Sequence, residues 1–341
     1  MSTMSRAHSE AGEAGEVVAR QIAANEAAMT ALVATLRERR PRFVVVSARG
    51  SSSHAGYYGK YLIEQMLGLV VAAVAPSVQT IYAAPLRVED ALFLTVSQSG
   101  RSPDLVAVAE AARRGGALTV AMVNDAASPL AAACERVLPL HAGPELSVAA
   151  TKSYLAAVAC FVHLVARWSG DAALSAALDR LPGRLRAAFT QDWAPLSQLL
   201  ANASDLLVIG RGTGFAAAKE IALKLKETCA LHAEAFSSAE VLHGPVALLE
   251  PGFPVLALML DDAAREGLTR VVADLRAKGA RVLAVGPAAT PPALPGLPPD
   301  HPLCDALPIV AGFYGGLDAL ARARGRDIDR PRHLRKVTET I

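Results

Sequence analysis

The sequence predicts an α/β protein made of two tandem domains, each a parallel sheet flanked by helices on both faces. Two observations support this prediction: short apolar strands alternate with helical stretches, and the same series of strands occurs twice along the chain. Alternating strands and helices are typical of βαβ units, in which crossover helices cover both faces of a parallel sheet. A length of 341 residues suits two such domains, because domains cluster at about 100 to 150 residues.

The duplication is visible when the chain is aligned with itself at an offset of 162 residues, which places Phe43 on Asp205. At both places the apolar run ends in Arg-Gly followed by Ser or Thr. The matching strands are 43–48 with 205–210, 91–96 with 253–258 and, one residue further along, 116–121 with 279–284. Three matches in the same order indicate a tandem duplication rather than a chance similarity.

Helical stretches fill the intervals between these strands, and glycines mark their ends. Gly115 and Gly279 follow two helical patterns, as C-cap residues do. The predicted helices are a leading helix at 16–40, crossover helices at 102–114 and 264–278, and a last helix at 309–324. A helical connection is predicted at 168–200, and a surface loop at the Pro-rich stretch 287–308.

These features divide the chain into four predicted parts. Residues 1–35 form a leading helical segment, and residues 36–180 form a first domain with a phosphate-binding loop. Residues 196–328 form a second domain, which carries a helix with candidate catalytic residues. Residues 329–341 form a C-terminal tail that is expected to pack back over the site.

Composition and charge argue against several classes of protein. A formal net charge of +2, without helix-turn-helix or zinc-finger spacing, does not favour a nucleic-acid partner. The apolar runs are shorter than the roughly 18 to 20 residues that a membrane span needs, and residues 1–40 lack an export signal. The four cysteines are widely spaced, as free thiols in a reducing compartment are, and no metal-ligand spacing occurs. We therefore expect a cytoplasmic protein that binds neither nucleic acid nor membrane and needs no metal.

A serine-rich turn follows the predicted strand at 91–96. Ser97-Gln98-Ser99-Gly100-Arg101-Ser102 offers three hydroxyls, and Pro103 would begin the next helix with its free N–H groups aimed at an anion. Gly50-Ser51-Ser52 follows the strand at 43–48, and ligands of such sheets bind beyond the carboxyl ends of the strands. The turn therefore indicates a phosphorylated small molecule, although a plain serine-rich connection has the same composition.

The second copy differs at the equivalent turn. Opposite Ser99 and Gly100 it has Asp261 and Asp262, whose carboxylates would repel a phosphate. We therefore expect only the first copy to bind the anion.

Four residues of the second half and the tail are candidates for chemistry. Lys224 and Glu227 are three residues apart on a predicted helix, where they lie together, although a solvated ion pair has the same spacing. His243 precedes Gly-Pro and therefore lies on a turn, where packing explains a histidine poorly. Lys336 would reach the site if the tail docks there, and it would otherwise be a solvated tail lysine.

Seven ordered motifs resemble the tandem sugar isomerase (SIS) domains of glucosamine-6-phosphate synthase. They are 50–52, 97–102, 145–152, 224–227, 232–236, 243–245 and 332–336, and the match runs from about residue 40 to the end. That synthase also carries an amidotransferase domain with a cysteine nucleophile, whereas this chain has no cysteine before Cys134. The chain is most similar to the SIS-type glucosamine-6-phosphate deaminases, which lack that domain.

The resemblance implies a role for each matched residue. The sugar phosphate would be held by Gly50, Ser51, Ser52, Ser97, Gln98, Ser99 and Ser102, with Val148 and Ala150 along the sugar. The family often has serine at the position of Ala150, which puts one hydroxyl contact in doubt. Glu227 would move a proton between C1 and C2 with Lys224 beside it, and His243 would open the ring from a neighbouring subunit. Lys336 aligns with a lysine that forms a Schiff base with the open-chain ketose.

The implied activity is hydrolytic deamination and isomerisation of glucosamine 6-phosphate to fructose 6-phosphate and ammonia, in amino-sugar catabolism. No cofactor is implied, and a homodimer with shared active sites is expected. One alternative is a SIS-type deglycase that acts on a fructosamine 6-phosphate, and another is a regulator that binds a sugar phosphate without turning it over.

Overall fold

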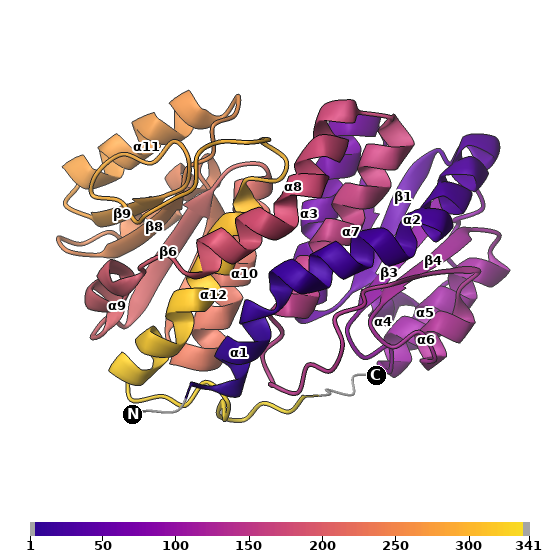
Figure 1. The fold of residues 1–341 in the computed structure, drawn as a ribbon, viewed down its shortest axis with the longest axis horizontal. Coiled ribbons are helices and arrows are strands. Elements are labelled where there is room, and N and C mark those ends of the chain that lie inside the picture. The colour runs from indigo at the N-terminus through magenta and orange to yellow at the C-terminus, as the bar shows by residue number, and fades with distance from the viewer. Residues whose placement is uncertain (1–3, 337–341) are drawn as a thin grey trace. The chain divides into compact units, whose positions relative to one another are not determined.

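The chain folds into two compact units in a computed structural model, which describes residues 4–336 (Figure 1). Among the described residues, the first-sheet unit comprises Glu16–Glu145, Lys152–Asp179 and residues 335–336. The second-sheet unit comprises residues 4–15, Leu146–Thr151 and Arg180–Leu334. Each unit is therefore assembled from segments that are separate in the sequence.

The first-sheet unit contains a five-stranded parallel sheet in the order β2-β1-β3-β4-β5. Its strands are β1 (Phe43–Ala48), β2 (Val71–Ala73), β3 (Ala91–Ser97), β4 (Leu118–Val123) and β5 (Arg136–Pro139). The central strands β1, β3 and β4 are apolar and were predicted. The edge strands β2 and β5 were not predicted, because three or four residues are too few to show a strand pattern.

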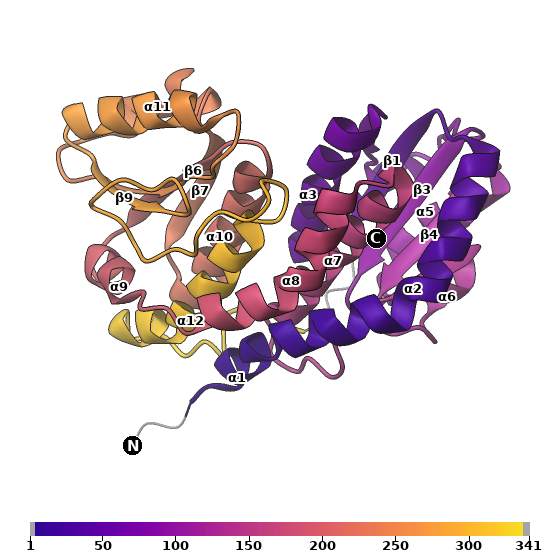
Figure 2. The ribbon, with the colours of Figure 1, turned by 45° about the horizontal axis from the view of Figure 1, so that its top comes forward.

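Helices cover both faces of this sheet (Figures 1 and 2). They are α2 (Ala14–Arg39), α3 (Gly50–Leu67), α4 (Pro76–Thr80), α5 (Pro103–Arg114), α6 (Pro129–Ala133) and α7 (Lys152–Ser169). Helix α5, with α4 and α6 beside it, lies on one face, where Val108 and Ala109 pack into a core with Phe93 of β3. Helices α3 and α7 pack against each other on the other face. The predicted arrangement of a parallel sheet between helices is confirmed.

The second-sheet unit repeats this plan with four parallel strands in the order β7-β6-β8-β9. The strands are β6 (Asp205–Gly210), β7 (His232–Ser237), β8 (Pro254–Leu258) and β9 (Arg281–Val285). The helices are α1 (Arg6–Gly12), α8 (Ala172–Phe189, which begins in the first-sheet unit), α9 (Ala194–Leu200), α10 (Thr213–Cys229), α11 (Arg265–Ala277) and α12 (Ala306–Ala323), with short 3₁₀ turns at Glu240–Leu242 and Pro245–Leu248. Helix α11 covers one face, and α10 and α12 lie on the other (Figure 1).

The two sheets have equivalent orders. Strands β2, β1, β3 and β4 correspond to β7, β6, β8 and β9, and β5 has no counterpart. The three strand pairs that match in the sequence therefore occupy the same consecutive positions in both sheets, with β9 at the edge of the second sheet. Equivalent turns consequently follow equivalent strands, which allows the turns of the two units to be compared one by one.

Several predicted helix boundaries differ from the structure. Helix α12 begins at Ala306 rather than at 309, so that Pro308 lies in its first turn, where the missing proline N–H needs no helical partner. The leading helix α2 begins at Ala14 rather than at 16, and the additional helix α1 precedes it. Ser5 caps α1 by accepting a hydrogen bond from the His8 N–H at 3.2 Å. A helix of seven residues is too short to show an apolar period in the sequence.

Between residues 4 and 336, no helix is long and apolar enough to cross a lipid bilayer. The four cysteines are buried thiols, and burial raises the pKa of Cys160 to about 12. Such thiols are poor nucleophiles at neutral pH, because the thiolate is the reactive form.

Candidate active site

The turns predicted to bind phosphate follow two adjacent parallel strands of the first-sheet unit. Ala48 of β1 pairs with Val96 of β3, so the turns that leave both strands start at the same edge of the sheet. Gly50 begins α3 with φ +52°, and Ser51 lies buried in the first turn of that helix. Ser102 is the N-cap of α5 and Pro103 its first residue, as predicted. Two helices therefore begin beside these serines, and the partial positive charge at their N-termini favours binding of an anion.

The serine hydroxyls are partly engaged within their own turn. The Ser97 Oγ accepts a hydrogen bond from the Gly100 N–H at 3.0 Å, and the Ser99 Oγ accepts one from the Arg101 N–H at 3.3 Å. Each hydroxyl keeps its own proton for donation, which is what a phosphate oxygen requires. Gly100 has φ +65°, and a Cβ there would lie 2.1 Å from the Ser128 Oγ, so only glycine fits.

An ion pair that the sequence analysis did not identify joins the two turns. Arg49, at the end of β1, donates from Nε and Nη2 to Asp104 Oδ2 at 2.9 and 2.6 Å. The Asp104 side chain is fully buried in the first turn of α5. Arg49 precedes Gly50, and Asp104 lies two residues after Ser102. This closeness to residues predicted to bind phosphate was the only signal in the sequence that could have pointed to the pair. The pair fixes the start of α5 against the turn that leads into α3.

The equivalent turns of the second-sheet unit contain a carboxylate. Gly212, with φ +56°, is the N-cap of α10, and an Asp262 carboxylate oxygen lies 3.9 Å from where a Cβ of Gly212 would be. Asp262 Oδ1 accepts a hydrogen bond from the Ala264 N–H at 2.9 Å. Burial raises the pKa of Asp262 above its ordinary value. A negative side chain therefore lies beside the helix N-terminus that could otherwise attract an anion.

Lys224 and Glu227 are in contact on α10, as their spacing predicts. The Lys224 side chain is fully buried, so the pair is not the solvated surface pair that the sequence also allowed. The Glu227 side chain keeps 22% of its exposure. Glu220, one turn earlier on α10, is a second carboxylate near Lys224, with its Oε1 3.5 Å from Nζ. The structure therefore has a buried ammonium between two carboxylates.

Val148 and Ala150 lie on the loop 146–151, which belongs to the second-sheet unit. Both side chains are half-buried. The buried Glu10 of α1 accepts hydrogen bonds from the N–H groups of Leu146 at 2.6 Å and Ser147 at 3.1 Å. Glu10 was not identified from the sequence, because nothing there links residue 10 to residues 146 and 147. It fixes the start of the loop that carries the candidate sugar contacts.

Lys336 belongs to the first-sheet unit, where its Nζ lies 3.5 Å from Glu145 Oε2. Glu145 is buried and also accepts hydrogen bonds from the backbone N–H and the hydroxyl of Ser153, at 3.1 and 2.6 Å. Lys336 is therefore a partly buried ion-paired residue rather than a solvated tail lysine. The remaining tail residues, 337–341, lie outside the described part of the chain.

His243 follows the 3₁₀ turn Glu240–Leu242 and is exposed, on a turn as predicted. Within the described residues its imidazole forms no hydrogen bond or ion pair. His243 and Glu227 are thus in the same unit but are not joined by any such interaction.

The structure brings the predicted residues together in three groups. The serines and Gln98 share one edge of the first sheet, Lys224 contacts Glu227, and Lys336 contacts Glu145. The serines, Gln98 and Lys336 are in the first-sheet unit, whereas Val148, Ala150, Lys224, Glu227 and His243 are in the second-sheet unit.

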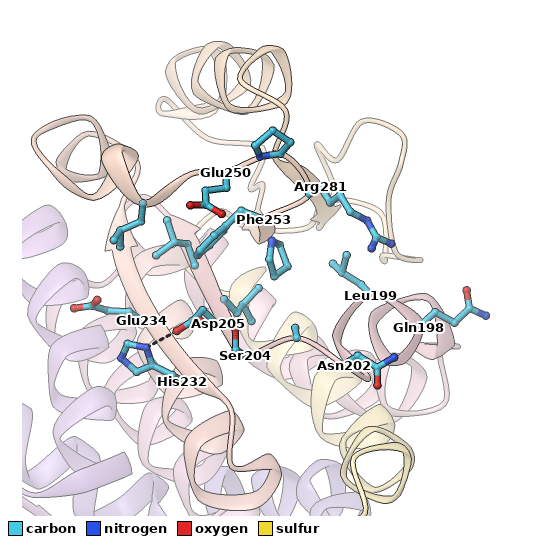
Figure 3. A pocket seen from close by; sticks show the side chains of 17 residues that line it. Gln198, Leu199, Asn202, Ser204, Asp205, His232, Glu234, Glu250, Phe253 and Arg281 are labelled. Atoms are coloured by element: carbon cyan, nitrogen blue, oxygen red, sulfur yellow. Dashed lines mark hydrogen bonds and ion pairs between the residues drawn. The ribbon is translucent and has the colours of Figure 1, made fainter.

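A separate cavity of about 670 Å³ opens at the amino ends of the strands of the second sheet (Figure 3). Its wall includes Asp205 and His232, whose Oδ1 and Nδ1 are 2.9 Å apart, together with Glu234, Glu250 and Arg281. None of the predicted site residues lines it. Because sheets of this type bind ligands beyond the carboxyl ends of their strands, this cavity is distinct from the candidate active site.

The model of the SIS domain family matches residues 36–167 and 199–289. The glutamine–fructose-6-phosphate aminotransferase (isomerizing) of Symbiobacterium thermophilum is 35% identical over 318 residues, which cover 86% of this chain and 51% of that protein. The chain therefore spans about half the length of the curated relatives it matches.

Two solved structures extend the comparison. A candidate phosphosugar isomerase from Silicibacter pomeroyi DSS-3 is 44% identical, with a TM-score of 0.90 over 96% of this chain and 100% of that one. The glucosamine-6-phosphate deaminase of Thermotoga maritima is 21% identical, with a TM-score of 0.77 over 95% of this chain and 100% of that one, and shows a shared fold. Because the family model matches most of its length and relatives exceed 30% identity, the chain belongs to the SIS domain family.

Proposed function

We propose that the chain is an enzyme of the phosphosugar isomerase type, and that it converts glucosamine 6-phosphate and water to fructose 6-phosphate and ammonia. The observation that carries this proposal is the contact between a fully buried Lys224 and the partly exposed Glu227. A partly exposed carboxylate beside a buried ammonium is suited to take up and release a proton next to a bound substrate. Membership of the SIS family and the hydroxyl-lined turn of the first sheet support a sugar phosphate as the substrate.

The proposed reaction balances with four groups of this chain. His243 opens the sugar ring by proton transfer, which an imidazole can perform near neutral pH. Glu227 takes the proton from C2 of the open-chain amino aldose and delivers it to C1, while one proton passes from the amino nitrogen to O1, so that C1 becomes CH2OH and C2 carries an imine. Water adds to that carbon and ammonia leaves, giving the ketose. The serines hold the phosphate throughout. In a further proposed step the Lys336 amine condenses with the C2 carbonyl of the ketose and releases water, and hydrolysis of this Schiff base returns the ketose and the free amine.

The relatives named as aminotransferases use glutamine, according to their names, and this chain matches half of their length. Hydrolysis to ammonia is proposed here because the matched motifs resemble the deaminases most. The proposal places the protein in amino-sugar breakdown in the cytoplasm, without a cofactor.

An ammonia-release assay tests this function. The purified protein should release one ammonia per fructose 6-phosphate formed from glucosamine 6-phosphate, without glutamine, and with the same rate in the presence of a chelator. Because the reaction is reversible, a high concentration of ammonia with fructose 6-phosphate should yield some glucosamine 6-phosphate. Release of ammonia from a fructosamine 6-phosphate alone would identify a deglycase instead, and binding without turnover of either sugar would identify a regulator.

We also propose a homodimer in which His243 serves the active site of the partner subunit. The exposed position of His243, away from any hydrogen-bond partner in the described chain, supports this proposal. Glu227→Gln and His243→Ala proteins should each be inactive. A mixed dimer formed by subunit exchange should have one intact site of its two, so it should regain about half of the wild-type activity, and a statistical mixture of dimers about a quarter. Mixed dimers that stay inactive would show that each site is built within one chain.

A further inference from the structure

Four side chains form a connected network inside the second-sheet unit. The Tyr314 hydroxyl of α12 donates a hydrogen bond to Glu220 Oε1 at 2.9 Å. The same carboxylate oxygen lies 3.5 Å from Lys224 Nζ, and Lys224 contacts Glu227 on its other side. Glu220 and Lys224 are fully buried, and Tyr314 is 1% exposed. The network therefore contains one more carboxylate than the ammonium needs for neutrality.

The two carboxylates differ in their surroundings. Glu220 is sealed in the protein and anchored by a tyrosine hydroxyl, whereas Glu227 keeps 22% of its side-chain exposure. Only Glu227 is therefore open to an exchange of protons with a bound molecule. A hydrogen bond to an ionised carboxylate stabilises the charged form, so Tyr314 favours a permanent negative charge on Glu220.

This difference matters when Glu227 changes its charge. An ammonium in the protein interior without a counter-charge is strongly unfavourable. If Glu227 were the sole counter-charge, each proton that it accepted would leave Lys224 buried and uncompensated. With Glu220 in place, the ion pair persists while Glu227 is neutral.

We propose that Glu220, held by Tyr314, is a positioning residue that supplies the lasting counter-charge of Lys224 and so allows Glu227 to carry the proton from C2 to C1. This inference rests on the proposed function for its kinetic part. Glu220 touches no reacting atom in this scheme. Its effect is on the protonated form of Glu227 that is produced when this carboxylate takes the proton from C2.

Kinetics provide the first test. In Glu220→Gln the side chain keeps its shape and still accepts from Tyr314, and we expect kcat to fall roughly 10- to 100-fold while KM stays within about threefold. Tyr314→Phe removes only the hydroxyl and should lower kcat about 2- to 10-fold. The matched controls are Glu266→Gln and Tyr82→Phe on the exposed surface, which should leave both constants unchanged. An unchanged kcat in Glu220→Gln would overturn the proposal.

Urea unfolding provides a second test that needs no turnover. Glu220→Gln and Glu227→Gln should each lose little stability, because either carboxylate alone can pair Lys224. The double variant should lose clearly more than the sum of the two, and adding Lys224→Met to it should restore stability. Additive losses would show that the carboxylates do not share the ammonium. If the wild-type protein does not turn over glucosamine 6-phosphate, the proposed function is wrong. The unfolding experiment would still show whether Glu220 and Glu227 share the charge of Lys224.

Discussion

The first and second sheets share a framework and differ at the turns that follow their equivalent strands. After β3 the chain continues into hydroxyl groups and a helix that begins at Pro103, whereas the counterpart strand β8 is followed by Asp261 and Asp262. One turn therefore offers donors to an anion, and the other already contains a negative charge beside the N-cap of α10. The duplicated frame thus supports two kinds of turn, because packing of the core does not depend on the turns.

The helices after the first strand of each sheet also differ. Helix α3 begins with Gly50, Ser51 and Ser52, which are small and polar, whereas α10 contains the buried Lys224 with its two carboxylates. This difference supports a division of tasks in which the first-sheet unit binds the phosphate and the second-sheet unit performs the proton transfer. The following predictions test that division.

The largest expected effect is on turnover. Glu227→Gln removes the proposed base from the second-sheet unit but leaves the serine turn intact. We expect kcat to fall about 10² to 10⁴-fold, the range typical of a missing general acid or base, with affinity for the sugar phosphate retained. Turnover of glucosamine 6-phosphate and binding calorimetry measure the two effects. Near-normal turnover would remove Glu227 from the mechanism.

A change in the first-sheet unit should instead reduce the affinity for the sugar phosphate. Ser99→Asp copies the carboxylate of the second copy into the phosphate turn, and like charges at close range cost several kcal/mol, so we expect affinity to fall about 100-fold or more. The control is Ser99→Ala, which removes the hydroxyl without adding charge and should weaken binding about 2- to 10-fold. Calorimetry with the sugar phosphate measures both. Equal affinities for the Asp and Ala variants would place the anion elsewhere.

Removal of the ion pair that joins the two proposed phosphate-binding turns should have a smaller effect on affinity for the sugar phosphate. Asp104→Asn weakens the hold on Arg49, so the turns after β1 and β3 should become less ordered. We expect affinity for the sugar phosphate to fall about 3- to 10-fold. A hydrogen bond to a charged group contributes about 1.5 to 3 kcal/mol, and only part of that loss reduces the free energy of binding because the ion pair acts through the order of the turns. The control Glu110→Gln neutralises an exposed carboxylate of the same helix. Equal effects of the two variants would mean that the ion pair does not order the turns.

The smallest effect concerns stability in the second-sheet unit. Burial raises the pKa of Asp262, so its charged form is less favourable in the folded protein than in the unfolded chain. The stabilising contribution is present below the unfolded pKa and is lost as pH rises through the raised folded pKa. Asp262→Asn should therefore raise the melting temperature by about 1 to 3 °C at pH 7 and by less at pH 3. A gain that is the same at both pH values would contradict the role of charge.

Much of the fold was predictable because it depends on local patterns. The central strands are runs of apolar residues, and the helices α5 and α11 lie within one residue of the predicted stretches because their caps are encoded locally. The edge strands β2, β5 and β7 were not identified as strands, whereas the apolar edge strand β9 was. Edge strands are short or alternate polar and apolar residues, as β7 does with exposed His232 and Glu234, and such patterns are weak.

For the site residues, contacts within one helix could be predicted from the sequence, whereas burial and contacts between helices could not. The spacing of Lys224 and Glu227 predicted their contact, because residues three apart share a helix face. The same spacing could not show that Lys224 is completely buried, since burial depends on elements far away in the sequence. The pairing of Glu220 with Tyr314 spans 94 positions and has no local signal.

The sequence by itself determined the duplicated α/β frame, the hydroxyl-rich turn and the helical spacing of the candidate catalytic pair. Each of these depends on periodicity or on residues adjacent in the chain, which neighbouring residues specify through hydrogen bonding and steric preference. Only the tertiary structure decided that Lys224 and Glu220 are fully buried, that Arg49 and Asp104 join the two proposed phosphate-binding turns, and that Glu10 fixes the loop 146–151. Burial of the α10 pair and the contacts of Arg49 and Glu10 depend on segments distant in the sequence, and these charges are stabilised because folding removes them from water and supplies a partner at the same time.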